Sequence, residues 1–168
     1  MQFPVRIFIA ASLLFIPITA MADVVWPALF LESRLFSWWA IGVGLLAEYI
    51  FIRWLFQQSI QRSLLATVAA NVVSTLAGVL LIPIAGLLWE IIPGSIYNSL
   101  LKWGTFNPVT WGATFILACL INTAIEALVY KNGFKFPFNR RAFFWIFIAN
   151  AVSVGVAFIT LFISPVET

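Results

Sequence analysis

The sequence predicts an all-α integral membrane protein, a four-transmembrane-helix bundle that follows an N-terminal signal peptide. Composition sets the class: hydrophobic residues make up 63% of the 168 residues, charged residues make up 9%, and the mean hydropathy is +1.06. Soluble domains carry about 25% charged residues, because charged side chains cover their surface. Four long apolar stretches then set the number of membrane-spanning helices.

Residues 1–22 (MQFPVRIFIAASLLFIPITAMA) have the pattern of a bacterial secretory signal peptide. Arg6 precedes an apolar run, and the closing Ala-Met-Ala supplies the small residues of a cleavage site. We expect the mature chain to begin at Asp23. The alternative is an uncleaved first helix, which would give five helices in all. Both alternatives leave Asp23 on the outer side of the membrane.

The four apolar stretches are each long enough to cross about 30 Å of hydrocarbon as a helix. They are Phe36–Phe56, Ser63–Leu88, Val109–Tyr130 and Ala142–Ile163. Short connections pair them into two repeated helical hairpins, at residues 36–90 and 109–163. An outer loop at 91–108 joins the hairpins, and an outer tail at 164–168 ends the chain.

The charges of the connections indicate the direction of the spans. Basic residues gather at the turns inside the two hairpins, whereas the acidic residues outside the spans lie at the opposite ends. This places the turns in the cytoplasm and both mature termini on the periplasmic side of a bacterial inner membrane. We also expect contacts with anionic lipids from these basic residues. They are Arg53, Arg62, Lys131, Lys135, Arg140 and Arg141.

Two outer segments, at residues 23–35 and 91–108, are not expected to span the membrane. We expect each to form a short helix lying in the outer interface, the second opening with a turn at Pro93-Gly94. The alternative is a lid over an outward-facing cavity.

The two hairpins have the pattern of one duplicated unit. A shift of 78 residues places Glu48 on Glu126, and a shift of 79 places Ala-Asn-Val-Val-Ser at 70–74 on Ala-Asn-Ala-Val-Ser at 149–153. Apolar helices match one another by chance, but here the rare polar residues match. Because both halves run in the same direction, the pseudo-twofold axis would stand along the membrane normal.

The spacing also predicts contacts between polar side chains inside the bundle. Residues equidistant from the turn of an antiparallel hairpin lie at equal depth, so Glu48 should face Asn71 and Glu126 should face Asn150. A carboxylate in the bilayer costs about 2.5–3.5 kcal/mol on insertion scales, so it normally faces protein or water. The expected polar seam comprises Glu48, Asn71, Ser74, Asn122, Glu126, Asn150 and Ser153.

Small residues in the spans are expected to shape the packing. Gly42, Gly44 and Gly78 are expected to be close-packing points between helices. Cys119, which lies inside an apolar helix, is expected to be a small packing residue. Pro83 is expected to kink the second span near its outer end.

The composition excludes most kinds of catalytic site. The chain has no histidine and one cysteine, which excludes His/Cys metal centres, His-ligated haem and Ser-His-Asp or Cys-His nucleophiles. Nine Lys and Arg residues against six Asp and Glu residues form no basic patch for nucleic acid. We therefore expect no cofactor, no metal and no nucleic-acid partner.

Three classes of function remain. The first, which we expect, is a non-enzymatic accessory or assembly subunit that sits in the lipid bilayer and binds another membrane protein or a second copy of itself. The second is a small proton- or cation-coupled carrier or channel that uses the two intramembrane Glu/Asn pairs. The third, a membrane enzyme with the two glutamates as acid and base, lacks an accompanying nucleophile or phosphate-binding loop.

Overall fold

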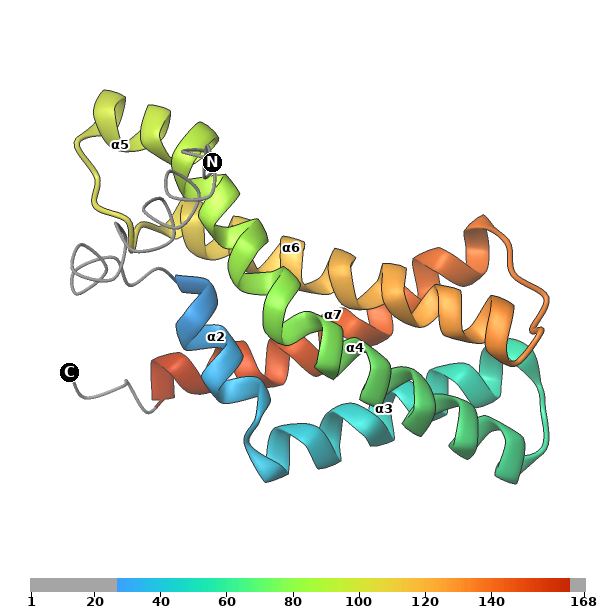
Figure 1. The fold of residues 1–168 in the computed structure, drawn as a ribbon. Helices are drawn as coiled ribbons and strands as arrows, with labels where there is room; N and C mark the ends of the chain where they lie inside the picture. Colours follow the sequence, from blue (N-terminus) through green and yellow to red (C-terminus); the bar gives the residue numbers. More distant parts are fainter. Residues whose placement is uncertain (1–26, 164–168) are drawn as a thin grey trace, which may run out of the picture.

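The computed structural model describes residues 27–163, and the regular structure within them is entirely helical. The predicted signal peptide and the tail at 164–168 lie outside the described residues. In chain order the elements are α2 (Pro27–Leu35), α3 (Trp38–Phe56), α4 (Ile60–Trp89), the π-helical turn η2 (Glu90–Gly94), α5 (Ser95–Leu101), α6 (Pro108–Leu128), the π-helical turn η3 (Val129–Gly133) and α7 (Arg140–Ile163) (Figure 1).

The chain is a multi-pass membrane protein, because four of its helical stretches are long and apolar enough to cross a bilayer. Each of α3, α4, α6 and α7 supplies one of them, so the predicted number of spans is confirmed within the described residues. Their limits lie close to those that the sequence predicts, except at the end of the second span.

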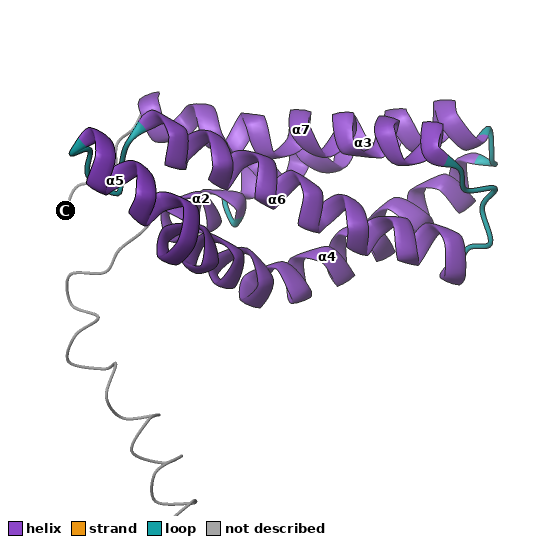
Figure 2. Ribbon diagram, turned by 90° about the horizontal axis from the view of Figure 1, so that it is seen from above, coloured by secondary structure: helices purple, strands orange, loops and turns teal. Residues whose placement is uncertain are grey.

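The four long helices form a closed ring. α3 packs against α7 and α4, and α6 packs against α4 and α7. Figure 2 shows two layers, with α3 and α7 in one and α4 and α6 in the other. The turns inside the two hairpins lie together at one end of the bundle, here called the turn end (Figure 1). α2 and α5 lie at the other end, here called the α2 end.

Local capping explains where the long helices begin. The Ser59 hydroxyl accepts a hydrogen bond from a backbone N–H in the first turn of α4. Asn107 does the same for α6, where Pro108 follows at the first helical position, and Asn139 does so for α7. These residue types at these positions are the usual helix-start signals, since they satisfy backbone donors that have no partner in the helix.

The turn predicted at Pro93-Gly94 is wrong, because the chain stays helical through these residues. Pro93 lacks a backbone N–H, which removes one helical hydrogen bond. The helix absorbs this loss in η2, where the Ser95 N–H reaches back five residues to the Glu90 carbonyl oxygen. The Ser95 hydroxyl also donates to the Ile91 carbonyl oxygen at 2.9 Å. α5 therefore continues the line of α4 instead of starting anew.

α2 packs across the α2 end of the bundle. Ala28 and Leu31 have no exposed surface, and the helix contacts α4, α6 and α7. The described part of the first outer segment is therefore packed into the helical bundle.

Two apolar clusters form the core, one at each end of the ring. The turn-end cluster comprises Ile52, Phe56, Ala66, Ala70, Tyr130, Phe136, Ala142 and Ile146. The α2-end cluster comprises Ala28, Leu31, Ala40, Ile82, Ala118, Cys119, Val154 and Ala157. Many members are alanines, which let helices approach closely, and Cys119 packs there as a small buried residue. The buried glutamates lie between the two clusters along the helices.

Candidate functional site

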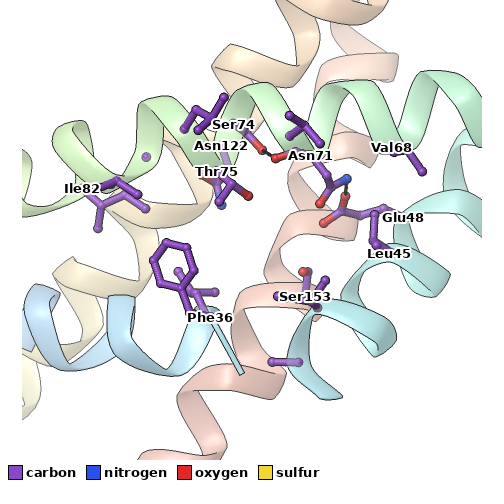
Figure 3. A pocket seen from close by; sticks show the side chains of 17 residues that line it. Phe36, Leu45, Glu48, Val68, Asn71, Ser74, Thr75, Ile82, Asn122 and Ser153 are labelled. Atoms are coloured by element: carbon purple, nitrogen blue, oxygen red, sulfur yellow. Dashed lines mark hydrogen bonds between the residues drawn. The ribbon is translucent and has the colours of Figure 1, made fainter. Parts of the chain in front are cut away.

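A cavity of about 280 Å³ lies between α3 and α4. Each of the four long helices contributes to its polar wall, which comprises Glu48, Asn71, Ser74, Thr75, Asn122 and Ser153 (Figure 3). The other lining residues are apolar or glycine. Of the predicted polar seam, Glu126 and Asn150 lie outside this wall and the other members line it.

The Glu48 carboxylate lies at the turn-end side of the cavity and is 2% exposed. It accepts a hydrogen bond from the Asn71 side-chain amide, and the Ser153 hydroxyl faces it from α7. The Asn71 amide also donates to the Thr67 carbonyl oxygen at 3.0 Å, one helical turn earlier on α4. This backbone contact holds the amide where it can meet α3 (Figure 3).

Gly44 lets Ser153 reach Glu48. Gly44 is buried on α3 one turn before the glutamate, and a Cβ atom there would collide with the Ser153 hydroxyl. The predicted close packing is therefore correct at Gly44. It is wrong at Gly42, which is exposed and has open space around the position of a Cβ atom. Residues two apart on a helix point in nearly opposite directions, so one glycine faces α7 and the other faces outward.

Glu126 occupies the corresponding position in the second hairpin and is 1% exposed. One of its oxygens accepts from the Asn150 side-chain amide at 2.8 Å, and the other accepts from the Ser74 hydroxyl at 3.2 Å. Asn150 also donates to the backbone of its own helix, at the Ile146 carbonyl oxygen. Both Glu–Asn contacts that the spacing predicts are thus present in the structure.

The serines cross between the hairpins. Ser74 belongs to the first hairpin and donates to the glutamate of the second, whereas Ser153 belongs to the second and faces the glutamate of the first. Each carboxylate therefore meets an amide from its own hairpin and a hydroxyl from the other. The spacing alone did not predict this exchange, because it depends on how the two hairpins face each other.

Asn122 and Thr75 are the polar side chains of the cavity wall that have no hydrogen-bond partner among the described residues. Asn122 is half-buried and lies near Gly78, where a Cβ atom would stand 3.5 Å from the Asn122 Oδ1. Gly78 is thus in ordinary contact distance of its neighbours, and its missing side chain leaves room in the cavity.

Buried polar side chains continue from the glutamates toward the turn end. Thr67 and Ser63 are fully buried on α4, one and two turns before Asn71, and Tyr130 is fully buried in η3, one turn after Glu126. The Tyr130 phenol faces Thr67. Sequence reasoning missed these three residues, although their spacing of four or eight from Asn71 and Glu126 could have indicated them.

Aromatic side chains close the turn end. Phe136 stacks on Tyr130 with ring centroids 6.1 Å apart and lies 4.8 Å from the Phe56 ring. The Arg62 guanidinium stands 5.3 Å from the Phe136 ring centroid and donates to the Phe134 carbonyl oxygen at 2.8 Å. We call these four side chains, Tyr130, Phe136, Phe56 and Arg62, the aromatic plug.

The predicted basic group gathers at the turn end, as the sequence suggests. Arg53 is half-buried and the others are exposed. A second hollow, of about 320 Å³, opens there between the hairpins, and its lining includes Trp54, Gln57, Asn139 and Arg141. Trp54 is also in edge-to-face contact with Trp145 of α7, with ring centroids 5.1 Å apart.

Neither a metal-binding cluster nor a similarity to known proteins identifies the function of this site. Within residues 27–163, no three His, Cys, Asp or Glu side chains lie together in a way that could hold a metal ion. Comparison with protein-family models, curated proteins and solved structures finds no match for this sequence. The function is therefore argued from the geometry of the cavity.

Proposed function

We propose that this chain is a small proton- or cation-coupled carrier of the membrane, in which Glu48 is the group that gains and loses the proton or cation. The observation that carries the proposal is the position of Glu48, a buried carboxylate at the end of a cavity. Ionisable groups inside membrane segments are costly and commonly mark ion or proton pathways. An accessory subunit, the function expected from the sequence, needs no such cavity.

The surroundings of Glu48 suit reversible binding. The Asn71 amide donates a hydrogen bond to the carboxylate and the Ser153 hydroxyl faces it, and both dipoles stabilise the carboxylate when it carries negative charge. The cavity beside it gives a proton or a small cation room to approach. Oxygen atoms are the ligands that hard cations prefer, and the Glu48 carboxylate supplies them.

The aromatic plug supports a carrier that opens on one side at a time. The cavity ends at Glu48, and the plug lies between Glu48 and the turn end. A carrier of this kind would bring the plug apart in its second state, exposing Ser63 and Thr67 on the way from Glu48 to the turn end. Opposed opening of this sort is the general scheme for coupled transport.

The exchanged serines support a duplicated hairpin. Glu, Asn and Ser recur at matching positions, and each serine faces the glutamate of the opposite hairpin. This is the reciprocal pattern that a parallel repeat about an axis along the membrane normal would produce.

For sidedness, we place the turn end in the cytoplasm of a bacterium and the α2 end on the periplasmic side of its inner membrane. The exposed basic residues at the turn end support this orientation. Anionic lipid headgroups would bind these basic side chains at the turn end. Arg141 lies beside a hollow that Trp54 also lines.

A second candidate function is the accessory or assembly subunit, which would bind another membrane protein or a second copy of the chain. The observation that favours it is that both glutamates already have hydrogen-bond donors from neighbouring helices. Such pairs hold helices in register without any transport.

Proton and cation uptake into proteoliposomes distinguishes the two functions. The purified chain would be reconstituted around a trapped pH-sensitive dye, and a pH, Na⁺ or K⁺ gradient would be applied. We expect Glu48→Gln to abolish the signal while the protein stays folded, because glutamine keeps a side chain that bonds Asn71. Glu90→Gln is the matched control, since Glu90 lies outside the cavity wall.

Full activity of Glu48→Gln would exclude the carrier. If the wild-type chain moved neither protons nor these cations, and purified from gently solubilised membranes with a stoichiometric partner, the accessory function would be preferred.

A further inference from the structure

We propose that the cavity binds an uncharged amphiphile dissolved in the membrane, a single apolar chain with one hydrogen-bonding end group, which enters sideways between α3 and α4. This inference rests on the proposed function, because it names the class of molecule that the Glu48 cavity would take.

The mouth of the cavity lies on the lipid-facing side of the bundle. In Figure 1, α3 and α4 cross partway along their length and separate widely toward the α2 end. The lining residues along this opening are apolar and exposed, with exposed fractions of 45% for Ile41, 53% for Val72, 73% for Leu76 and 47% for Val79. Apolar side chains of a membrane-spanning helix face hydrocarbon, so this mouth opens into the bilayer.

The junction of α2 and α3 covers the cavity toward the α2 end. Leu35 and Phe36, at this junction, line the cavity, and the preceding turns of α2 are packed into the bundle through Ala28 and Leu31. Figure 3 shows the Phe36 ring beside Ile82 at this end. With the aromatic plug at the turn end, the lateral mouth is the opening that the described residues leave for a ligand.

Polarity changes along the cavity. Its wall on α4 runs from Val68 to Ile82, which spans about 21 Å at the rise of an α-helix. The polar groups gather near Glu48, whereas the α2 end is lined by Phe36, Ile41 and Ile82. An elongated molecule with a polar end near Glu48 and an apolar chain toward α2 matches this order.

The open polar groups define the end group of the ligand. Asn122 and Thr75 make no hydrogen bond among the described residues, and together they offer both donors and acceptors. A hydroxyl, carbonyl or amide end group would pair with them. A phosphate or carboxylate is disfavoured, because the charged side chain in the wall is the acidic Glu48.

In the second hairpin, an aromatic side chain fills the corresponding groove between α6 and α7. Phe158 stands 79 residues after Val79, at the matching position of α7. Its ring packs edge-to-face on Phe115 and on Trp111, with centroids 5.5 and 5.7 Å away. A phenylalanine at position 79 should therefore fill the groove between α3 and α4, and Val79→Phe is the variant of choice.

Photolabelling tests the proposal. The full chain in lipid nanodiscs would be irradiated with hexadecanol that carries a photoactivatable diazirine in mid-chain, and labelled peptides would be mapped by mass spectrometry. We expect labelling to concentrate on the cavity-lining residues of α3 and α4 and to fall several-fold in Val79→Phe. Leu80→Phe is the matched control, because Leu80 is exposed on α4 outside the cavity and should leave labelling unchanged.

Competition gives a second measurement that needs no variant. Unlabelled hexadecanol should reduce cavity labelling several-fold, whereas hexadecyl phosphate should not. Labelling spread evenly over all exposed apolar faces, or equal competition by the phosphate, would overturn the proposal. So would unchanged labelling in a folded Val79→Phe.

The two proposals fail in different ways. Uptake that depends on Glu48 without cavity labelling would overturn the amphiphile alone. Specific cavity labelling together with a fully active Glu48→Gln would instead overturn the coupled carrier and leave a binding protein for amphiphiles.

Discussion

The two hairpins carry the same three polar side chains and expose them differently. In the second hairpin Glu126 and its partner Asn150 are both sealed, and Asn150 has no exposed surface. In the first hairpin Glu48 is equally buried, but its partner Asn71 is half-buried and both line a cavity. The polar motif therefore sets which groups bond one another, while the side chains around it decide whether a ligand can reach them.

Aromatic residues account for the difference. Between α6 and α7, the rings of Phe115 and Phe158 pack together against the α2-end cluster. At the position that matches Phe158, the first hairpin has Val79, whose smaller side chain leaves the space open. Gly78, next to Val79, adds no side chain of its own.

The largest expected effect is a difference in protein stability between alanine substitutions of the two glutamates. Glu126→Ala leaves the Asn150 amide buried without its side-chain acceptor, and an unsatisfied buried group costs about 1–3 kcal/mol. Glu48→Ala should cost less, because the cavity lets water or a ligand satisfy Asn71. Denaturant titration in mixed micelles would measure the free energy of unfolding of both variants. Equal losses of this free energy would contradict the proposed difference between the two hairpins.

A cavity should open in the second hairpin when its filling ring is shortened. Phe158→Val removes the ring that packs on Phe115 and Trp111, and we expect a loss of about 1–3 kcal/mol in the free energy of unfolding. The photolabel used for the first cavity should then also reach α6 and α7. A variant of full stability with no new labelling would show that another feature seals this hairpin.

The smallest expected effect concerns the glycines of α3. Gly44→Ala pushes Ser153 away from Glu48, and the lost polar contact should cost about 0.5–1.5 kcal/mol. Gly42→Ala is the matched control two residues earlier, where the added methyl group meets open space. It should be neutral or stabilise the helix by up to about 1 kcal/mol. The same unfolding measurement applies, and similar behaviour of the two variants would contradict the assigned contact.

Much of this protein follows from its sequence by itself. Composition determines that the chain spans a membrane, because 63% hydrophobic residues cannot be buried inside a soluble domain of this size. Ser59, Asn107 and Asn139 mark helix starts through local hydrogen bonds. The Glu–Asn contacts follow from helical rise and from the position of each turn, which fix the depth of a residue within its own hairpin.

Tertiary structure alone decided the features that involve both hairpins. The exchange of Ser74 and Ser153, the cavity beside Glu48 and the packing of α2 depend on how each helix is rotated toward its neighbours. The helical path through Pro93 likewise depends on a π-helical turn that a Pro-Gly pattern does not predict. Depth along a helix is set by local geometry, but rotation and the filling of space are set by the volumes of side chains far apart in the chain.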